Sequence, residues 1–453
     1  MSFDQIASLV VLVGVVALMV QGKMRADVVA LLGAAILLVL GVVRPVEVQG
    51  AFASPAVIAL AGLFVMAYAI ELSGLLGLLI RQATRMSSRI GALGIWVVIG
   101  LCGSVGGFLN NTPVVVLAAP VIRDVARSLG LSPKRFLMPL SHVTVMGGLL
   151  TLIGTSTNLL VNDMARNAGQ PVFGMFEITP VGLIIASAGG IWLYVVGARQ
   201  LGRSAARDEE NAPPPPPAHR RQAAFPRLGE ARNQPDGSGD ASLGDVALYK
   251  AADRPLRLRP ALISLVVFVA VVTTAAMGWA PIAAAAFAGA VSLIILKVIT
   301  PDEAYAGLRP EILLLIAGMV VMGTAIEVTG LAEAAADRLI GVIRPLGPLG
   351  ALIVLYGVTL FATELLSNAT VAVLMTPIAV AVAESLGADP RPFLVAVMMA
   401  ASAAFATPFG YQTNVLVYNM AGYSYLDFVR VGLPLNLVTW SAAMFAIPAF
   451  FPF

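Results

Sequence analysis

The chain has 453 residues, of which 58% are hydrophobic and only 12% are charged, with 28 Lys and Arg side chains against 25 Asp and Glu. A water-soluble protein carries about 25% charged residues, so this chain cannot cover a globule with an ionic surface. The composition excludes a soluble enzyme, a disordered protein and a nucleic-acid-binding domain, and we expect no nucleic-acid partner. It predicts an all-α polytopic protein of the cell (inner) membrane, surrounded by the lipid bilayer.

Apolar runs of the length needed to cross a bilayer, about 20 residues, follow one another along the chain. They occupy residues 5–22, 26–43, 55–79 and 176–198 in the first half, and 260–277, 281–299, 310–332 and 430–450 in the second. Two longer apolar regions, 90–167 and 347–422, are each interrupted by a polar tip and by a polar pentapeptide that contains Gly. Each region predicts two helical arms that meet at the tip, followed by a broken helix. The total is five crossings in each half.

The two halves are separated by residues 200–257, which are rich in Pro, Gly, Asp and Arg. This composition cannot bury enough apolar surface to order itself, so it predicts a disordered linker between a first domain, 1–199, and a second, 258–453. With the N-terminus outside, the cytoplasmic ends of the runs carry 12 basic side chains and the outer ends carry five, without the linker. Cytoplasmic loops are enriched in basic residues, so we expect both termini outside and the linker in the cytoplasm.

The halves are internal repeats of one another, with an offset of 256 or 257 residues. The matched pairs are Pro45 and Pro301, Glu47 and Glu303, Gly62 and Gly318, Asn111 and Asn368, and Asn158 and Asn414, among others. An odd number of crossings per repeat means that the second copy enters the membrane from the opposite face. The sequence therefore predicts two inverted repeats of five transmembrane helices, an architecture typical of secondary transporters.

Four polar breaks interrupt the helices, at residues 110–112, 154–158, 367–370 and 410–414. Non-helical backbone inside a membrane is tolerated only where protein or a water-filled cavity satisfies its polar groups. Each break is followed by an apolar helix, so four helix N-termini are expected to meet near the repeat interface. The carbonyl and side-chain oxygens on the other side of each break suit a small, hard cation such as Na⁺.

Each helix N-terminus offers free amide donors and about half a positive charge, which favour an anion. All Lys and Arg side chains, Arg309 among them, are assigned to a membrane surface or a loop, so no basic side chain is expected at the site. A divalent anion would then be neutralised by helix dipoles and co-bound cations, which favours cation coupling. The candidate anion-binding residues are Asn111, Thr112, Thr155, Ser156, Thr157, Asn158, Asn368, Ala369, Tyr411, Gln412, Thr413 and Asn414.

Few titratable groups lie inside the apolar runs. Among them, Glu364 is the candidate that could bind a cation or a proton, because intramembrane carboxylates are functional candidates by default. Glu71 and Glu327 precede Gly at equivalent places and are expected at helix ends. Asp163 is expected to cap a helix or line the outer vestibule, and His142 to be a buried histidine with its hydrogen bonds satisfied.

The segment from Ser402 to Gly410, continuing to Asn414 and Val417, resembles the signature of the divalent anion/sodium symporter family, which includes sodium–sulfate and sodium–dicarboxylate carriers. Phe409 departs from the aliphatic residue that is usual there. The paired Ser-Asn-Thr hairpin tips of that family are similar to residues 110–112 and 367–369, each with one substitution. The resemblance covers both repeats and excludes the linker.

This resemblance implies two re-entrant hairpins, an elevator-like motion of a transport domain, and a homodimer. It implies substrate between Asn111, Thr112, Thr155, Asn368 and Tyr411. It also implies two sodium sites, the first formed by Gly106, Asn110, Asn111 and Gly154, and the second by Thr363, Ser367, Asn368 and Gly410.

Dicarboxylate carriers of the family often have paired prolines where this chain has Ser156-Thr157 and Gln412-Thr413, so the chain is more similar to the sulfate-type branch. The leading hypothesis is a sodium-coupled symporter that imports a divalent anion, first of all sulfate, by an elevator-type alternating-access mechanism. The alternatives are a sodium-coupled C4-dicarboxylate symporter and a cation/proton antiporter, which would rely on Glu364. An enzyme is disfavoured because no nucleophile–base or metal-ligand set occurs at a shared depth.

Overall fold

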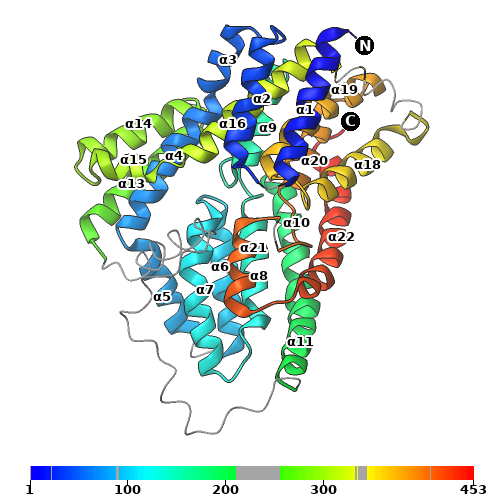
Figure 1. The fold of residues 1–453 in the computed structure, drawn as a ribbon. Coiled ribbons are helices and arrows are strands. Elements are labelled where there is room, and N and C mark those ends of the chain that lie inside the picture. Colours follow the sequence, from blue (N-terminus) through cyan, green and yellow to red (C-terminus); the bar gives the residue numbers. More distant parts are fainter. Residues whose placement is uncertain are drawn as a thin grey trace.

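The computed structural model describes residues 2–21, 23–87, 91–210, 256–331, 334, 344–408 and 410–453. Every regular element in these ranges is a helix, as the composition predicted (Figure 1). Phe409 and most of the predicted linker, residues 211–255, lie outside the described residues. Six of the described helices are long and apolar enough to cross a membrane.

The two halves have the same order of elements. The first half contains α1 (Phe3–Gln21), α2 (Ala26–Val39), α3 (Pro45–Phe52), α4 (Pro55–Leu72), α5 (Leu75–Ser87), α6 (Ala92–Gly106), α7 (Asn111–Ser128), α8 (Lys134–Gly147), α9 (Ser156–Asn167), α10 (Thr179–Trp192), the π-helix η1 (Leu193–Gly197) and α11 (Ala198–Glu210). The second half contains α13 (Leu258–Ala276), α14 (Ile282–Ile295), α15 (Pro301–Gly307), α16 (Pro310–Val328), η3 (Arg344–Leu346), α18 (Gly347–Ala362), α19 (Asn368–Leu386), α20 (Pro390–Ala401), α21 (Gln412–Ala421) and α22 (Tyr425–Phe450).

Several helices differ in extent from the apolar runs. The runs 55–79 and 310–332 end as helices at Leu72 and Val328, because Gly74 and Gly330 adopt positive φ values of 75° and 67° that terminate a helix. Glu71 and Glu327 are therefore the penultimate residues of α4 and α16. The run 176–198 continues through η1 into α11, so helix extends to Glu210, beyond the expected domain boundary at residue 199.

The helices of one half pack reciprocally on those of the other. Helix α2 packs against α16 while α14 packs against α4, and α9 packs against α19 while α21 packs against α7. A two-fold relation between two copies produces this pattern, because each contact then occurs twice with the partners exchanged. In Figure 1, α6 and α7 lie in the lower half of the molecule and α18 and α19 in the upper half. Both termini lie in the upper part, and α11 ends at the bottom.

The matched Pro and Glu residues of the repeats start the two short helices α3 and α15. Glu47 accepts a hydrogen bond from the backbone nitrogen of Arg44 at 2.7 Å, and Glu303 accepts one from the backbone nitrogen of Thr300 at 2.8 Å. Thr300 and Glu303 form a capping box, in which the N-cap and the third helical residue satisfy each other's polar groups, whereas the Arg44 guanidinium donates to the Glu47 carboxylate. The repeated Pro-x-Glu pattern is therefore a helix start signal.

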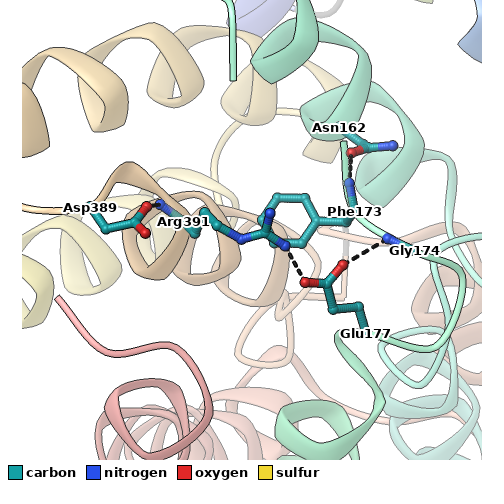
Figure 2. Close-up of polar contacts among 6 residues, drawn as sticks. All are labelled: Asn162, Phe173, Gly174, Glu177, Asp389 and Arg391. Atoms are coloured by element: carbon teal, nitrogen blue, oxygen red, sulfur yellow. Dashed lines mark hydrogen bonds and ion pairs between the residues drawn. The ribbon is translucent and has the colours of Figure 1, made fainter. Parts of the chain in front are cut away.

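A polar tie joins the α9–α10 loop of the first half to α20 of the second (Figure 2). Arg391 forms an ion pair with Glu177, and its guanidinium lies 4.5 Å from the centre of the Phe173 ring. The loop itself is held by Asn162, which accepts from the backbone nitrogen of Phe173 at 2.7 Å. The Arg391 side chain is 22% exposed and that of Glu177 is 37% exposed, so this tie lies at the surface and is partly screened by solvent.

Two equivalent glycines allow the closest helix contacts between the halves. A Cβ atom at Gly62 of α4 would lie 2.5 Å from the carbonyl oxygen of Ala286 in α14, and one at Gly318 of α16 would lie 2.9 Å from the carbonyl carbon of Ala30 in α2. Neither backbone neighbour can move without displacing its helix. The matched glycines are thus required by the packing of α4 against α14 and of α16 against α2, the four helices that we call the scaffold.

Gly62→Ala and Gly318→Ala are each expected to lower stability by about 1–3 kcal/mol, because the added methyl group overpacks a backbone contact. The same change at Gly190 in α10, where nothing lies within 4 Å, is expected to leave stability unchanged or slightly raise it. Thermal unfolding of the purified variants in detergent measures the difference. Equal melting temperatures for all three variants would contradict the packing argument.

Candidate functional site

A cavity of about 370 Å³ lies between two walls of different character. One wall is apolar and comes from α4 and α16, with residues such as Leu63, Phe64 and Ile312. The other is polar and comes from all four breaks. Of the residues expected at the site, the polar wall includes Asn110, Thr112, Gly154, Thr155, Ser156, Ser367, Asn368, Ala369, Gly410, Tyr411 and Gln412.

The structure brings four helix N-termini to this cavity, those of α7, α9, α19 and α21. Three of them are capped by the preceding residue: Asn110 accepts from the backbone nitrogen of Thr112 at 3.1 Å, Thr155 from that of Thr157 at 3.4 Å, and Ser367 from that of Thr370 at 3.2 Å. Each cap satisfies one of the free amides of the first turn. The polar tips are therefore helix starts, and further amides of each first turn are left for a ligand.

The two hairpin-tip asparagines have different surroundings. Asn111 is buried, and in the orientation that satisfies all its partners its amide nitrogen donates to the carbonyl oxygens of Gly106 (3.3 Å) and Thr144 (3.1 Å), while its oxygen accepts from the Tyr411 hydroxyl (3.3 Å). Asn368 lines the cavity and is 9% exposed. Its oxygen lies 2.9 Å from the Thr363 hydroxyl, and its amide nitrogen has no partner.

The first hairpin tip contacts the second broken helix directly. Besides the bond between Asn111 and Tyr411, the Thr112 hydroxyl lies 3.3 Å from the side-chain oxygen of Gln412. These contacts join residues 300 positions apart in the sequence. The tip of the first hairpin, residues 110–112, and the break at residues 410–414 therefore form one polar surface that spans both halves of the chain.

Five expected anion-binding residues do not line the cavity, namely Asn111, Thr157, Asn158, Thr413 and Asn414. Asn158 donates to the carbonyl oxygens of Gly148 (3.3 Å) and Thr151 (3.0 Å) in its own break. Asn414 does the same with Ala404 (2.9 Å) and Thr407 (3.3 Å). These asparagines hold the breaks open, because the carbonyls of the unwound backbone need donors.

The hydroxyl groups of Thr157 and Thr413, which lie at equivalent places in the breaks at 154–158 and 410–414, also face protein. Thr413 lies 2.7 Å from the Ser141 hydroxyl, which is also 2.7 Å from the side-chain oxygen of Asn414. Thr157 is buried and lies 3.4 Å from the Thr155 hydroxyl. Their positions beside cavity residues in the sequence do not bring them into the cavity, because the first helical turn rotates successive side chains to different faces.

Glu364 lines the cavity, but its carboxylate is occupied by protein donors. One oxygen accepts from the backbone nitrogens of Phe405 (2.9 Å) and Ala406 (2.7 Å) and from the amide of Asn436 (2.8 Å), and the other accepts from the backbone nitrogen and hydroxyl of Thr407, both at 2.9 Å. Five donors saturate a carboxylate, which offers about four lone-pair sites. Glu364 therefore anchors the backbone that leads into the break at residues 410–414, and its carboxylate is not free to bind a cation or a proton.

The expectation that no basic side chain reaches the site is wrong. Arg309, the residue before α16, lines the cavity together with Ile312 and Leu315 of the same helix. The sequence placed it at the membrane surface because it precedes an apolar run. Arg309 does lie at the end of the helix, as the N-cap residue of α16, but this helix end lines the same cavity as Tyr411, the N-cap residue of α21.

The expected sodium ligands gather around glycines that allow close approach of backbone. A Cβ at Gly106 would lie 2.9 Å from the Asn111 side-chain amide, whose nitrogen faces Gly106 in the orientation that satisfies its partners, and one at Gly154 would lie 2.9 Å from the carbonyl oxygen of Gly107. A Cβ at Gly410 would lie 2.9 Å from the Thr407 hydroxyl and 3.4 Å from a carboxylate oxygen of Glu364. Within the first expected set Gly106 thus lies beside Asn111, and within the second the Thr363 hydroxyl lies 2.9 Å from the Asn368 oxygen, while Gly410 lies beside Thr407 and the Glu364 carboxylate.

Two other predicted residues lie away from this cavity. His142 is fully buried against Phe405 and Phe428, and neither ring nitrogen has a hydrogen-bond partner, so the expected satisfied histidine is not what the structure shows. Asp163 forms an ion pair with Arg166, and both line a second cavity of about 1050 Å³ beside the start of α4.

The fold and the cavity are those of a membrane transporter, since six described helices are long and apolar enough to cross a membrane and four helix N-termini meet at a polar cavity. A family model described as a citrate transporter (CitMHS) matches residues 15–392 and 365–452, so the chain belongs to the citrate transporter family. The resemblance to divalent anion/sodium symporters is thereby confirmed at the level of the family.

Relatives with transporter names support this assignment. The chain is 25% identical to an uncharacterized transporter, sll0640, of Synechocystis over 95% of this chain and 94% of the relative. It is 36% identical to sodium/sulfate cotransporter 1 of Chlamydomonas reinhardtii over 137 residues, which are 30% of this chain and 16% of that protein. The crystal structure of the YdaH transporter of Alcanivorax borkumensis has a similar fold, with a TM-score of 0.56 at 15% identity over 89% of this chain and 86% of that one.

Glu364→Gln is expected to lower the melting temperature and transport together. The amide would place a donor against the donors that now bind one carboxylate oxygen, at a cost of about 1–3 kcal/mol or more. Glu384→Gln, on an exposed position of α19, is the control and is expected to have no effect. Unchanged stability combined with altered cation or pH dependence would instead identify Glu364 as an ion ligand.

Proposed function

We propose that this chain is a sodium-coupled secondary symporter that imports a divalent anion, with sulfate as the leading substrate. The observation that carries the proposal is the convergence of four helix N-termini on one cavity. Each contributes amide donors and about half a positive charge, so the polar wall attracts an anion. The unpartnered amide nitrogen of Asn368 adds a buried donor at the same wall.

Sodium coupling is supported by the oxygens behind the anion site. The oxygens around Gly106, Gly154 and Gly410 are backbone carbonyl and hydroxyl oxygens, which suit a hard monovalent cation. The Glu364 carboxylate adds negative charge next to the second set without offering a free oxygen. Relatives from Chlamydomonas reinhardtii are named sodium/sulfate cotransporters, which agrees with this pairing of ions.

The two walls of the cavity suggest how the substrate moves. The apolar wall belongs to α4 and α16, which contact α14 and α2 in a scaffold, whereas the polar wall belongs to the hairpins and broken helices. An elevator-type alternating-access motion would carry the polar wall past the apolar one. Apolar side chains on the fixed wall suit such a movement, because they make no hydrogen bonds that the motion would have to break.

The reciprocal packing supports two inverted repeats, expected at 1–199 and 258–453. The distribution of basic residues along the sequence supports a cytoplasmic linker, expected at 200–257, with both termini outside. The resemblance adds a homodimer. In this arrangement each break lies near the midplane, where inverted repeats place their substrate and coupling ions.

A C4-dicarboxylate is the second candidate substrate, because the family description names a carboxylate. A cavity of about 370 Å³ admits either anion, so its volume does not select between them. A cation/proton antiporter is less well supported, since the five donors on Glu364 leave it no free lone pair.

Purified protein in proteoliposomes is expected to take up labelled sulfate faster when sodium is high outside than when choline replaces it. Succinate and citrate uptake, measured in parallel, rank the substrates. Succinate uptake faster than that of sulfate would assign the C4-dicarboxylate alternative, whereas citrate uptake faster than both would assign a tricarboxylate as the substrate. Uptake of each anion at the same rate without sodium would refute sodium coupling.

Asn368→Ala is expected to reduce anion uptake at least ten-fold at unchanged melting temperature, because it removes a cavity donor that has no protein partner. Asn111→Ala is expected to reduce both uptake and melting temperature, since its side chain has three partners. Asn167→Ala, at the exposed end of α9, is the control. Normal uptake by both Asn111→Ala and Asn368→Ala would show that the site assignment is wrong.

A further inference from the structure

Arg309 is the one basic side chain that lines the central cavity in the part of the chain that the structure describes. It is the N-cap residue of α16, its side chain forms no cap hydrogen bond, and it is half-buried. Arg309, Ile312 and Leu315 are spaced three residues apart, so they lie on one face of the helix start, toward the cavity. The guanidinium is thus at the edge of the apolar wall, opposite the helix N-termini.

No described carboxylate forms an ion pair with Arg309. Glu364 lines the same cavity, but its two oxygens already accept five hydrogen bonds from the second break and α22. Arg309 and Tyr411 line the same cavity from opposite walls. Its positive charge is therefore directed at the cavity without a protein counter-charge.

The first half has no equivalent charge. The N-cap residue of α4 is Ser54, which like Arg309 precedes the Pro that begins the helix, and its hydroxyl accepts from the backbone nitrogen of Val57. Near that end of α4 the basic side chain is Arg166, which is paired with Asp163. An unpaired basic group therefore lines the cavity from one end of the scaffold only.

We propose that Arg309 is a specificity-determining residue, whose guanidinium pairs with the negative charge of the transported anion at the mouth of the cavity. The proposal rests on the proposed function and deepens it. A guanidinium presents a planar fork of donors that matches two oxygens of an oxyanion or a carboxylate, and it stays charged at all physiological pH values. It therefore favours divalent over monovalent anions of similar size.

The position of Arg309 also makes its contribution dependent on conformation. Arg309 belongs to the wall of α4 and α16, while the amide donors belong to the hairpins and breaks on the other wall. The guanidinium acts on the anion when the two walls face each other as they do in this structure. In the opposite state of the transport cycle the anion leaves its reach. Arg309 thus raises anion affinity on one side of the membrane.

The test is anion and sodium titration of uptake into proteoliposomes by Arg309→Gln, Arg309→Lys and the control Arg259→Gln, an exposed basic residue of α13. We expect Arg309→Gln to raise the KM for the divalent anion about ten-fold or more, with the half-saturating sodium concentration and the maximal rate within two-fold of wild type. Arg309→Lys should recover part of the affinity, and Arg259→Gln should match wild type. A merely structural role would lower the maximal rate and the melting temperature instead.

An unchanged KM in Arg309→Gln, with wild-type protein active, overturns this inference and leaves the proposed function standing. If wild-type protein transports neither sulfate, succinate nor citrate, the proposed function fails, and Arg309 is then judged by thermal stabilisation in titrations with these three anions. If the anion concentration that gives half-maximal stabilisation is at least ten-fold higher in Arg309→Gln than in wild type, the anion contact is supported. Equal half-maximal concentrations in the two proteins would refute the anion contact. So would the absence of any stabilisation of wild-type protein by the three anions.

Discussion

The structure depends on satisfying unwound backbone inside a membrane. A carbonyl or amide group without a partner costs several kcal/mol in hydrocarbon, so the four breaks require donors and acceptors from the protein itself. Asn158 and Asn414 solve this problem in the same way, each donating to the carbonyls ten and seven residues before it. This shared spacing explains why both repeats retain an asparagine there, and why neither side chain is available to a substrate.

The break at residues 410–414 has an additional anchor, the carboxylate of Glu364, which the equivalent break at 154–158 lacks. In the first half, the Thr151 hydroxyl donates to the carbonyl oxygen of Gly107. In the second half the equivalent Thr407 contacts the carbonyl oxygen of Glu364 at 3.2 Å, and the Glu364 carboxylate also collects three backbone amides. A buried carboxylate is costly unless it is hydrogen-bonded, and here it is bonded to saturation. The result is a fixed negative charge beside one break and none beside the other.

The electrostatics of the cavity follow from this asymmetry. Helix N-termini make the polar wall attractive to an anion, Glu364 makes the region behind the second break more attractive to a cation, and Arg309 adds positive charge from the opposite wall. A purely dipolar site, as the sequence suggested, is therefore incomplete. The charges are therefore separated in space. The helix N-termini and Arg309 line the open cavity. The Glu364 carboxylate oxygens are bonded to protein donors next to it.

The sequence by itself determined the membrane class, the all-helical fold, the repeat and the positions of the four breaks, because composition, hydropathy and helix-start residues such as Asn110 and Ser367 act locally along the chain. It could not determine which side of a break each polar side chain would face. Only tertiary structure decided that Arg309 lines the cavity, that Asn111 is held by three partners while Asn368 keeps a free amide, and that five donors occupy Glu364. The physical reason is that a hydrogen bond needs two groups within about 3 Å, and here the partners come from segments up to 300 residues apart, whose approach is set by packing.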